Sequence, residues 1–139
     1  MKVHTHRAEI STRGQGDAHD VTHVVAAALK ASDLRAGIAA VFVVGSTAAI
    51  TTIEFESGAI ADFNRMLEVL APRHGEYQHH LRWHDDNGSS HVRAALLGPS
   101  TTIPFTDGQL LLGTWQQVML LELDTGSRKR ELVVQIVGE

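Results

Sequence analysis

The C-terminal third of the chain is dominated by stretches that predict β-strands, and these limit the fold more than any other feature. Residues 110–124, LLLGTWQQVMLLELD, form a long apolar run in which Gly113 is a predicted bulge. Residues 124–130, DTGSRKR, predict a turn that closes a hairpin onto a further strand, ELVVQIVG, at 131–138. Earlier in the chain, IAAVFVV at 38–44 is apolar and β-branched enough for a central strand. These stretches together predict a largely antiparallel sheet.

The first half of the chain adds one more strand and two helices to this prediction. Residues 3–12 predict a strand, and Asp20 predicts the N-cap of an amphipathic helix that ends near Ser32. Ser57 predicts the cap of a second helix, which Pro72 ends. The order of strand, helix, strands, helix and a strand-rich C-terminal half predicts an α+β fold with two main helices.

Three shorter segments connect these elements. Residues 45–56, GSTAAITTIEFE, are predicted to continue the central strand. Residues 73–90 have almost no periodicity and form the longest irregular stretch, and long ordered loops in compact domains are often functional. Residues 91–98, HVRAALLG, alternate weakly and are predicted as a strand that begins after this loop.

Length and composition exclude several classes of protein. A chain of 139 residues has the usual size of one domain, so residues 1–139 are predicted to form a single domain. The net charge is -4, which argues against a protein that binds nucleic acid through its phosphates. There are no cysteines, so disulfides, thiolate zinc sites and a cysteine nucleophile are excluded. With no signal peptide and no apolar stretch of membrane-spanning length, a cytoplasmic protein without membrane contacts is expected.

Histidines are concentrated between residues 79 and 91. His79, His80, His84 and His91 fall in this short segment, and neutral imidazole is a common metal ligand. Their spacings match no established metal motif, and HExxH is absent. Two interpretations stay open at this point: a metal site completed by nearby carboxylates, or a solvated loop that is rich in histidine.

Two further clusters have both a chemical and a structural interpretation. Glu54 and Glu56 are two residues apart at a predicted strand end, so their carboxylates share a face, which raises one pKa or recruits a cation. The alternative is a polar strand end that leads into the next helix. Ser46 and Thr47 lie in a small, hydroxyl-rich stretch that suits either phosphate binding or tight sheet packing.

Three other features are candidates for contacts with a ligand. Arg93 follows His91 by two residues in a predicted strand and would share its face, where it suits a phosphate or a carboxylate. Trp115 follows a glycine, and its indole either stacks on a flat ring or packs in the core. SRKR at 127–130 is either a solvated turn or a group that steers an anion.

Taken together, several stretches resemble the YjbQ-type family of small proteins, whose members are often labelled secondary thiamine-phosphate synthases. These stretches, in chain order, are STAAITTIEFESG, YQHH, DDNGSSH, LLGPSTTIPFTDGQLLLGTWQQV and SRKRELVVQIVG. The resemblance covers nearly the whole chain. It implies a compact α+β domain with a β-sandwich-like core, a homotrimer, and a pocket near the subunit boundaries. It also implies a divalent cation, Mg²⁺ or Zn²⁺, in that pocket.

The resemblance also assigns residues to the pocket. Carried over by motif, they are Glu54, Glu56, His79, Asn87, His91, Gly113, Trp115 and Gln116. The chain departs from the family pattern at Gly45, where many members have a histidine directly before the hydroxyl pair. His80 or His84 is the candidate to compensate for that missing histidine.

The function implied is that of a transferase. A pyrimidine pyrophosphate would lose pyrophosphate to attack by the nitrogen of a thiazole phosphate. The catalytic candidates are His91, His79, Arg93 and Glu56; the substrate-binding candidates are Ser46, Thr47, Asn87, Gly113, Trp115 and Gln116; and the metal candidates are His79, His91, Glu56 and Glu54. The alternative is a metal- or anion-binding module, or a phosphoester hydrolase, that acts on a different small phosphorylated ligand.

Overall fold

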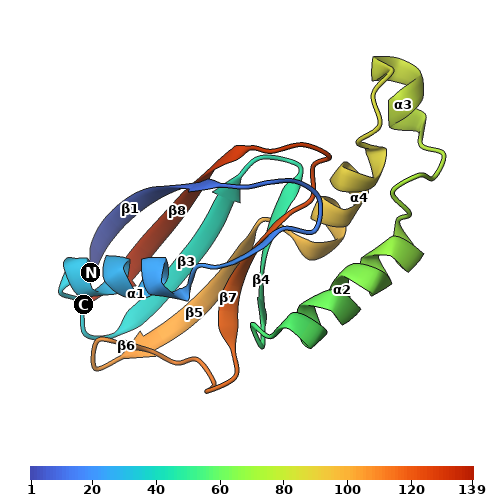
Figure 1. Ribbon diagram of the computed structural model, residues 1–139. Coiled ribbons are helices and arrows are strands. Elements are labelled where there is room, and N and C mark those ends of the chain that lie inside the picture. Colours follow the sequence, from blue (N-terminus) through green and yellow to red (C-terminus); the bar gives the residue numbers. More distant parts are fainter.

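A computed structural model describes residues 1–139 as two curled antiparallel sheets and four helices (Figure 1). The strands are β1 (Lys2–Ser11), β2 (Ala18–Asp20), β3 (Gly37–Val44), β4 (Ala48–Ile53), β5 (Ser100–Thr106), β6 (Gln109–Leu110), β7 (Gln117–Glu122) and β8 (Lys129–Gly138). The helices are α1 (Thr22–Ser32), α2 (Ser57–Leu70), α3 (Gln78–Trp83) and α4 (Gly88–Leu97). The predicted α+β class with a mostly antiparallel, sandwich-like core is confirmed.

The strands divide unequally between the two sheets. The larger sheet has the order β1-β8-β3-β5-β6 and the smaller one the order β2-β7-β4, and every pairing is antiparallel. β3 lies at the centre of the larger sheet between β8 and β5, as its apolar, β-branched sequence predicts. The smaller sheet matters most for the site, because its two ends hold different groups of predicted site residues.

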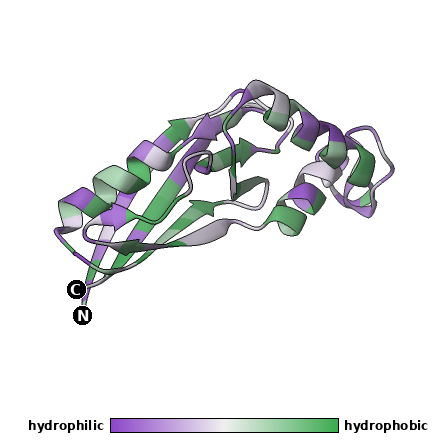
Figure 2. Cartoon of the chain, turned by 90° about the horizontal axis from the view of Figure 1, so that it is seen from below, coloured by the Kyte–Doolittle hydropathy of each residue, from purple (hydrophilic) through white to green (hydrophobic).

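The main core lies between the larger sheet on one side and α1 with the inner face of the smaller sheet on the other. Seventeen buried apolar residues form it. α1 contributes Val25, Ala28 and Leu29, which recur at helical spacing and are all buried. In Figure 2, hydrophobic and hydrophilic residues alternate along this helix, as expected when one face is buried and the other exposed. The stripe that predicted the first helix is therefore the surface that covers the sheet.

A second, smaller core lies on the outer face of the smaller sheet. α2 buries Leu67 and α4 buries Ala94 against residues of β4 and β7, among them Met119 and Leu121. Because alternate residues of a strand point to opposite faces, β7 contributes to both cores. α2 and α4 are in this way fixed to the same sheet, with α3 projecting beyond them (Figure 1).

The prediction was wrong for the segment that precedes β5. Residues 91–98 were predicted as a strand, but residues 91–97 belong to α4, and the predicted irregular stretch 73–90 contains α3 and the beginning of α4. Alanine, leucine and arginine are good helix formers, and Ala94 and Leu97 pack together on the smaller sheet at helical spacing. In a helix, residues two apart are about 200° apart, so His91 and Arg93 point in different directions rather than sharing a face.

The connections between sheets also differ from the prediction. The chain does not continue straight from β3 into residues 45–56 but turns at Gly45, whose φ is +144°, and enters β4 in the other sheet. Residues 124–130 do not close a hairpin, because β7 and β8 belong to different sheets. Gly113 lies in the loop between β6 and β7 rather than in a bulge. At both places the chain passes from one sheet to the other, so Gly45 and the turn that begins at Asp124 lie at the same end of the sandwich.

Helix capping follows the sequence only in part. Val21 occupies the N-cap position of α1, although the predicted Asp20 still accepts a hydrogen bond from the Thr22 N–H at 3.0 Å. Glu56, rather than Ser57, caps α2.

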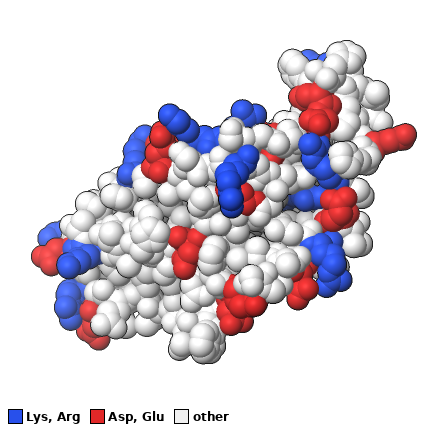
Figure 3. Space-filling view, in the orientation of Figure 1, with Lys and Arg blue, Asp and Glu red and all other residues white.

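None of the four helices combines the length and the apolar composition that a membrane crossing requires. On the face seen in Figure 3, acidic and basic side chains are mixed, without a large area of one sign.

Candidate functional site

The predicted site residues lie in two groups, one at each end of β4. Glu54, Glu56 and the loop from Gly113 to Gln116 lie near Ile53, at the end of β4. The histidines of α3 and α4 lie with Ser46, Thr47 and Asn87 beyond its other end, at Ala48 (Figure 1). At about 3.3 Å per residue, six residues of strand separate the two groups by roughly 17 Å.

The two glutamates at the first end do not form a shared acidic site. Glu56 turns its carboxylate into the first turn of α2, where it accepts hydrogen bonds from the N–H groups of Ala59 (2.7 Å) and Gly58 (2.9 Å). These bonds favour the charged form and lower the pKa of Glu56, whereas two adjacent carboxylates would have raised it. Glu54 is exposed. The structure therefore gives Glu56 a capping role.

The loop between β6 and β7 is tied to the same end of β4. The Gly113 N–H donates to Gln116 Oε1 at 3.0 Å, and Gln116 Nε2 donates to Thr52 Oγ1 at 3.3 Å. Trp115 is 73% exposed, so its indole does not belong to the core. The tryptophan is free to contact a ligand or another chain, but only at this end of the sheet.

At the other end, α3 and α4 bring two of the predicted histidines together. The rings of His79 and His91 have centroids 4.5 Å apart and are tilted by 39°. His79 Nδ1 lies 3.0 Å from Asp85 Oδ1, an ion-pair distance, although the two groups are not aligned for a hydrogen bond. Both rings are half-buried. This pair, contributed by two helices, is the most direct agreement between the predicted site and the fold.

A cavity of about 360 Å³ adjoins His91. It is lined by Gly45, Ser46, Ala48, His91, Ala94, Ala95 and Pro99. Two predicted site residues, Ser46 and His91, therefore face one hollow although they are far apart in the sequence. A larger hollow of about 610 Å³ near the chain ends contains none of the predicted site residues.

Several buried polar atoms near the beginning of α4 have no hydrogen-bond partner. They are Asn87 Oδ1, Ser90 Oγ and, in α3, His79 Nδ1, and Ser90 is fully buried. The fourth such atom in the chain, Asn64 Oδ1, lies on α2. Because most buried polar groups are hydrogen-bonded, three orphans in one corner mark a place where a polar ligand or water is expected.

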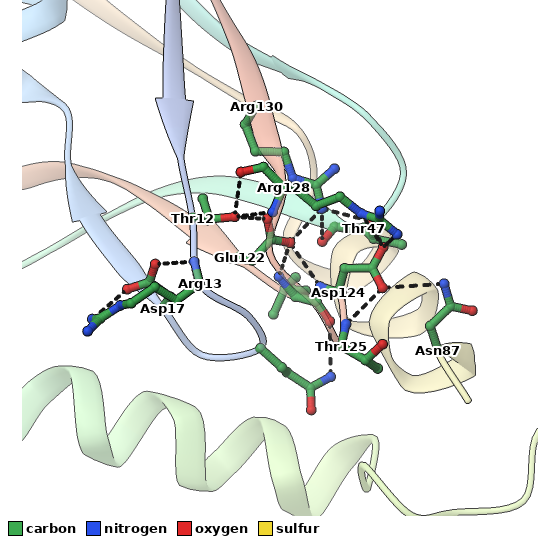
Figure 4. Close-up of polar contacts among 12 residues, drawn as sticks. Thr12, Arg13, Asp17, Thr47, Asn87, Glu122, Asp124, Thr125, Arg128 and Arg130 are labelled. Atoms are coloured by element: carbon green, nitrogen blue, oxygen red, sulfur yellow. Dashed lines mark hydrogen bonds and ion pairs between the residues drawn. The ribbon is translucent and has the colours of Figure 1, made fainter. Parts of the chain in front are cut away.

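A buried ionic cluster lies beneath this corner (Figure 4). Glu122 is fully buried, and its carboxylate pairs with Arg130, whose Nε donates to Oε1 at 2.8 Å. Thr12 donates to the same oxygen, and Arg130 Nη2 also donates to Thr47 Oγ1 at 2.8 Å. Sequence reasoning missed this cluster. The alternation of β8 carried the signal, because Arg130 is in phase with Leu132 and the other inward-facing residues of the strand.

Asp124 connects the cluster to the beginning of α4. It accepts hydrogen bonds from Thr47 Oγ1 at 3.0 Å and from Arg128 Nη2 at 2.9 Å, and Asn87 Nδ2 lies 3.5 Å from its other oxygen. Burial by itself raises the pKa of Asp124, but the hydrogen bonds from the Thr125 N–H, Arg128 and Thr47 outweigh it and bring the pKa to about 2. Asp124 therefore stays ionised and holds Thr47 and Asn87 on either side of it.

The predicted cationic residue Arg93 does not face the cavity. Its Nε donates to the Ala71 carbonyl at 2.9 Å and its Nη2 donates to Glu68 at 2.6 Å, and the residue is only 3% exposed. In the monomer these contacts fasten α4 to the end of α2. The sequence placed Arg93 beside His91 only because residues 91–98 were predicted as a strand.

The donors predicted for a divalent cation do not converge in one chain. No group of three or more histidine, aspartate or glutamate side chains is placed to hold a metal ion. His79 and His91 meet, but Glu54 and Glu56 lie at the far end of β4, and Glu56 is occupied as a cap. The side chains of one chain therefore do not fit the predicted metal site.

Comparison with known proteins identifies the family of the chain. The sequence model of the family described as UPF0047 protein YjbQ-like matches residues 6–139. The chain belongs to the YjbQ-like family. A UPF0047 protein from Methanothermobacter thermautotrophicus is 39% identical over 139 residues, which cover 100% of this chain and 95% of that protein. The resemblance seen in the sequence motifs is thereby confirmed.

Solved structures of YjbQ-like proteins have the same fold. A YbjQ-like protein of unknown function from Sulfolobus solfataricus superposes with a TM-score of 0.89 at 31% identity, over 99% of this chain and 100% of that chain. An uncharacterized conserved protein of the yjbq/upf0047 family from Clostridium acetobutylicum gives a TM-score of 0.81 at 32% identity, over 94% and 99% of the two chains. The antiparallel sheets and their helices are therefore shared across this YjbQ-like group.

Neither candidate replacement for the missing histidine of the YjbQ-like pattern lines the cavity. His80 Nε2 accepts a hydrogen bond from the Gly88 N–H at 3.2 Å and so caps the beginning of α4. His84 is exposed and ends α3 in a left-handed conformation, with φ of 54°. The YjbQ-like chain therefore has no substitute imidazole at Gly45.

The depressed pKa of Asp124 predicts a loss of stability in acid. A carboxyl whose pKa falls on folding stabilises the folded state above its unfolded pKa, and this contribution is lost as the pH falls from about 4 through about 2. The difference between 3.8 and about 2 corresponds to about 2.5 kcal/mol, which screening at the half-exposed Arg128 reduces to about 1–2 kcal/mol. In urea unfolding, the free energy of unfolding of Asp124→Asn should fall between pH 4 and pH 2 by this much less than that of the wild type. Asp107→Asn, at an exposed pair with Arg35, serves as the control and should keep the wild-type slope.

Proposed function

We propose that the corner between α3, α4 and the Gly45 turn is the active site of a small-molecule enzyme with thiamine-phosphate-synthase-like transferase activity. One observation carries the proposal: the imidazoles of His79 and His91 lie against each other, and His91 lines a cavity that Ser46 also lines. An imidazole that lines a hollow and is paired with a second imidazole is an arrangement expected of acid–base chemistry on a bound ligand.

In the proposed reaction, the thiazole nitrogen attacks the methylene carbon of the pyrimidine pyrophosphate. The bond from that carbon to the pyrophosphate oxygen breaks, and the leaving oxygen takes the electron pair. His91, which lines the cavity, is the residue we assign to protonate or hydrogen-bond the departing oxygen. His79 lies against His91 and close to Asp85, so we assign it to orient that imidazole. Ser46 and Asn87 are the proposed ligand-binding groups of this corner.

A phosphoester hydrolase or an anion-binding module is the second candidate. It is favoured by the position of Trp115, which lies near the opposite end of β4 and so cannot stack on a ring held in this cavity of the same chain. Hydrolysis of a small phosphoester needs only the histidine pair and groups that bind the phosphate. Both candidates act on phosphorylated small molecules, which suits the cytoplasmic location expected from the sequence.

The proposed assembly is a homotrimer, as the family resemblance implies. Apolar residues on the outer face of the larger sheet support it. Val3, Val137 and Ile38 are paired across three neighbouring strands, and Val3 and Ile38 are 60% and 46% exposed. Monomers rarely leave contiguous apolar patches uncovered. Association is also the route by which the Trp115 loop of one chain would approach the histidine pair of another.

The proposed activity is tested by supplying the purified protein with the pyrimidine pyrophosphate and the thiazole phosphate, with and without Mg²⁺. Formation of thiamine phosphate, measured by chromatography, is the expected result. Release of phosphate from p-nitrophenyl phosphate without synthase turnover would support the hydrolase instead. Absence of both reactions in the presence of Mg²⁺ or Zn²⁺ would overturn the enzymatic proposal. Light scattering on the same sample measures the mass, for which three chains are expected.

A further inference from the structure

Arg130 makes all its hydrogen bonds through two of its three guanidinium nitrogens. Nε donates to Glu122, and Nη2 donates to Glu122 and to the carbonyl and hydroxyl oxygens of Thr47. Nη1 has no hydrogen-bond partner, and yet it is not among the fully buried polar atoms that lack one. Although the residue as a whole is 6% exposed, Nη1 therefore keeps an opening to solvent.

That opening lies at Gly45. A Cβ placed on Gly45 would lie only 2.8 Å from Nη1, so the guanidinium occupies the space that any side chain at this position would need. Gly45 also lines the cavity together with Ser46 and His91. Arg130 does not itself line the cavity, but its free end lies directly beside Gly45, which does, at the position where many members of the family have a histidine.

We propose that Arg130 Nη1, the Ser46 hydroxyl and the His91 imidazole form a binding subsite for a phosphoryl group. The proposal deepens the proposed function and rests on its placement of the site at this corner. Ser46 and His91 make no side-chain hydrogen bond within the chain, so their polar atoms remain available. Arginine forms strong, charge-assisted hydrogen bonds to phosphate oxygens. Two donors that line the hollow and a third beside Gly45 match the three terminal oxygens of a phosphoryl group better than the two of a carboxylate.

The buried cluster makes Arg130 a suitable phosphate ligand. Glu122 and Thr47 fix the orientation of the guanidinium, so little side-chain entropy remains to be lost when an anion binds. Arg93, the cation expected from the sequence, has its guanidinium engaged by Ala71 and Glu68 instead. In this proposal Arg130, on β8, replaces Arg93 as the cationic residue of the site.

The test uses inorganic phosphate as the probe at constant ionic strength. In the wild-type protein, the guanidinium NMR signals of Arg130, assigned through the side chain from the backbone, should shift and saturate as phosphate is added. Gly45→Ala places a methyl group against Nη1 and should weaken phosphate binding, measured by calorimetry, at least tenfold. Gly108→Ala is the matched control, because Gly108 also has a positive φ (72°) but lies in the turn between β5 and β6. It should bind phosphate as the wild type does.

Two results would overturn the subsite. One is an Arg130 signal that does not respond to phosphate; this measurement needs only the wild-type protein and decides the matter even if Gly45→Ala fails to fold. The other is equal phosphate affinity in folded Gly45→Ala and wild type. Saturable phosphate binding at Arg130 in a protein without turnover would support the subsite and contradict the proposed enzymatic activity. Failure of the subsite and failure of the proposed function are therefore distinguishable.

Discussion

Replacing Glu122 with alanine is expected to lower the free energy of unfolding by about 3–5 kcal/mol. Glu122 is fully buried, and it is the only carboxylate that pairs with the equally buried Arg130. Its removal would leave the Arg130 guanidinium in a low-dielectric interior without a counter-charge. The effect is large because an unpaired charge in the protein interior costs more free energy than the loss of one contact.

The measurement is urea unfolding of the variant beside Glu131→Ala. Glu131 also pairs with an arginine, Arg7, at 2.9 Å, but that pair lies on the surface, with side chains 71% and 43% exposed. Exposed pairs contribute about 0–1 kcal/mol, so the control should stay close to wild type. Equal losses in the two variants would contradict the view that the buried cluster holds this end of the sandwich together.

Replacing His91 with alanine is expected to lower kcat/KM by about 10²–10⁴-fold, the range typical for removal of a general acid or base. His91 is the only titratable residue that lines the cavity, and no other side chain there is placed to exchange a proton. The reaction to be followed is whichever of the two proposed phosphate chemistries the wild-type protein performs. The pH dependence of kcat/KM should also change in the variant, because the assigned proton donor is removed.

His74→Ala is the matched control for this experiment. His74 is exposed between α2 and α3 and lies outside the cavity, so its removal should leave kcat/KM within about twofold of wild type. Near-ultraviolet circular dichroism verifies that both variants are folded. A His91→Ala variant with unchanged kcat/KM and an unchanged pH profile would remove His91 from the mechanism.

The sequence predicted well the elements whose residues have a clear period. β3 is apolar, with several β-branched residues, and lies at the centre of its sheet, and the apolar stripe of α1 faces the core as its spacing requires. The segment of α4 was missed because HVRAALLG is short and its apolar residues suit a weak strand nearly as well as a helix. The choice between strand and helix depends on the packing of Ala94 and Leu97 on the smaller sheet, and a single sequence does not show that contact.

The candidate site was predictable only in part, for a related reason. His79, His91 and Ser46 were selected by residue type and do meet at one corner. Glu54 and Glu56 were selected in the same way, but they follow the last residue of β4, whereas Ser46 precedes its first residue. The length of the strand therefore separates them. Arg130 lies in a basic segment that resembles an exposed turn. Its phase in β8 indicates burial, but nothing local identifies Glu122, on a strand of the other sheet, as its partner.

A crystal soaked in tungstate, a heavy analogue of phosphate, tests most directly whether this corner is the ligand-binding site of the protein. We expect an anomalous peak inside the cavity, in contact with Ser46 and His91 and within hydrogen-bond distance of Arg130 Nη1. Tungstate bound only elsewhere on the surface, with the cavity beside His91 left without a peak, would contradict the assignment.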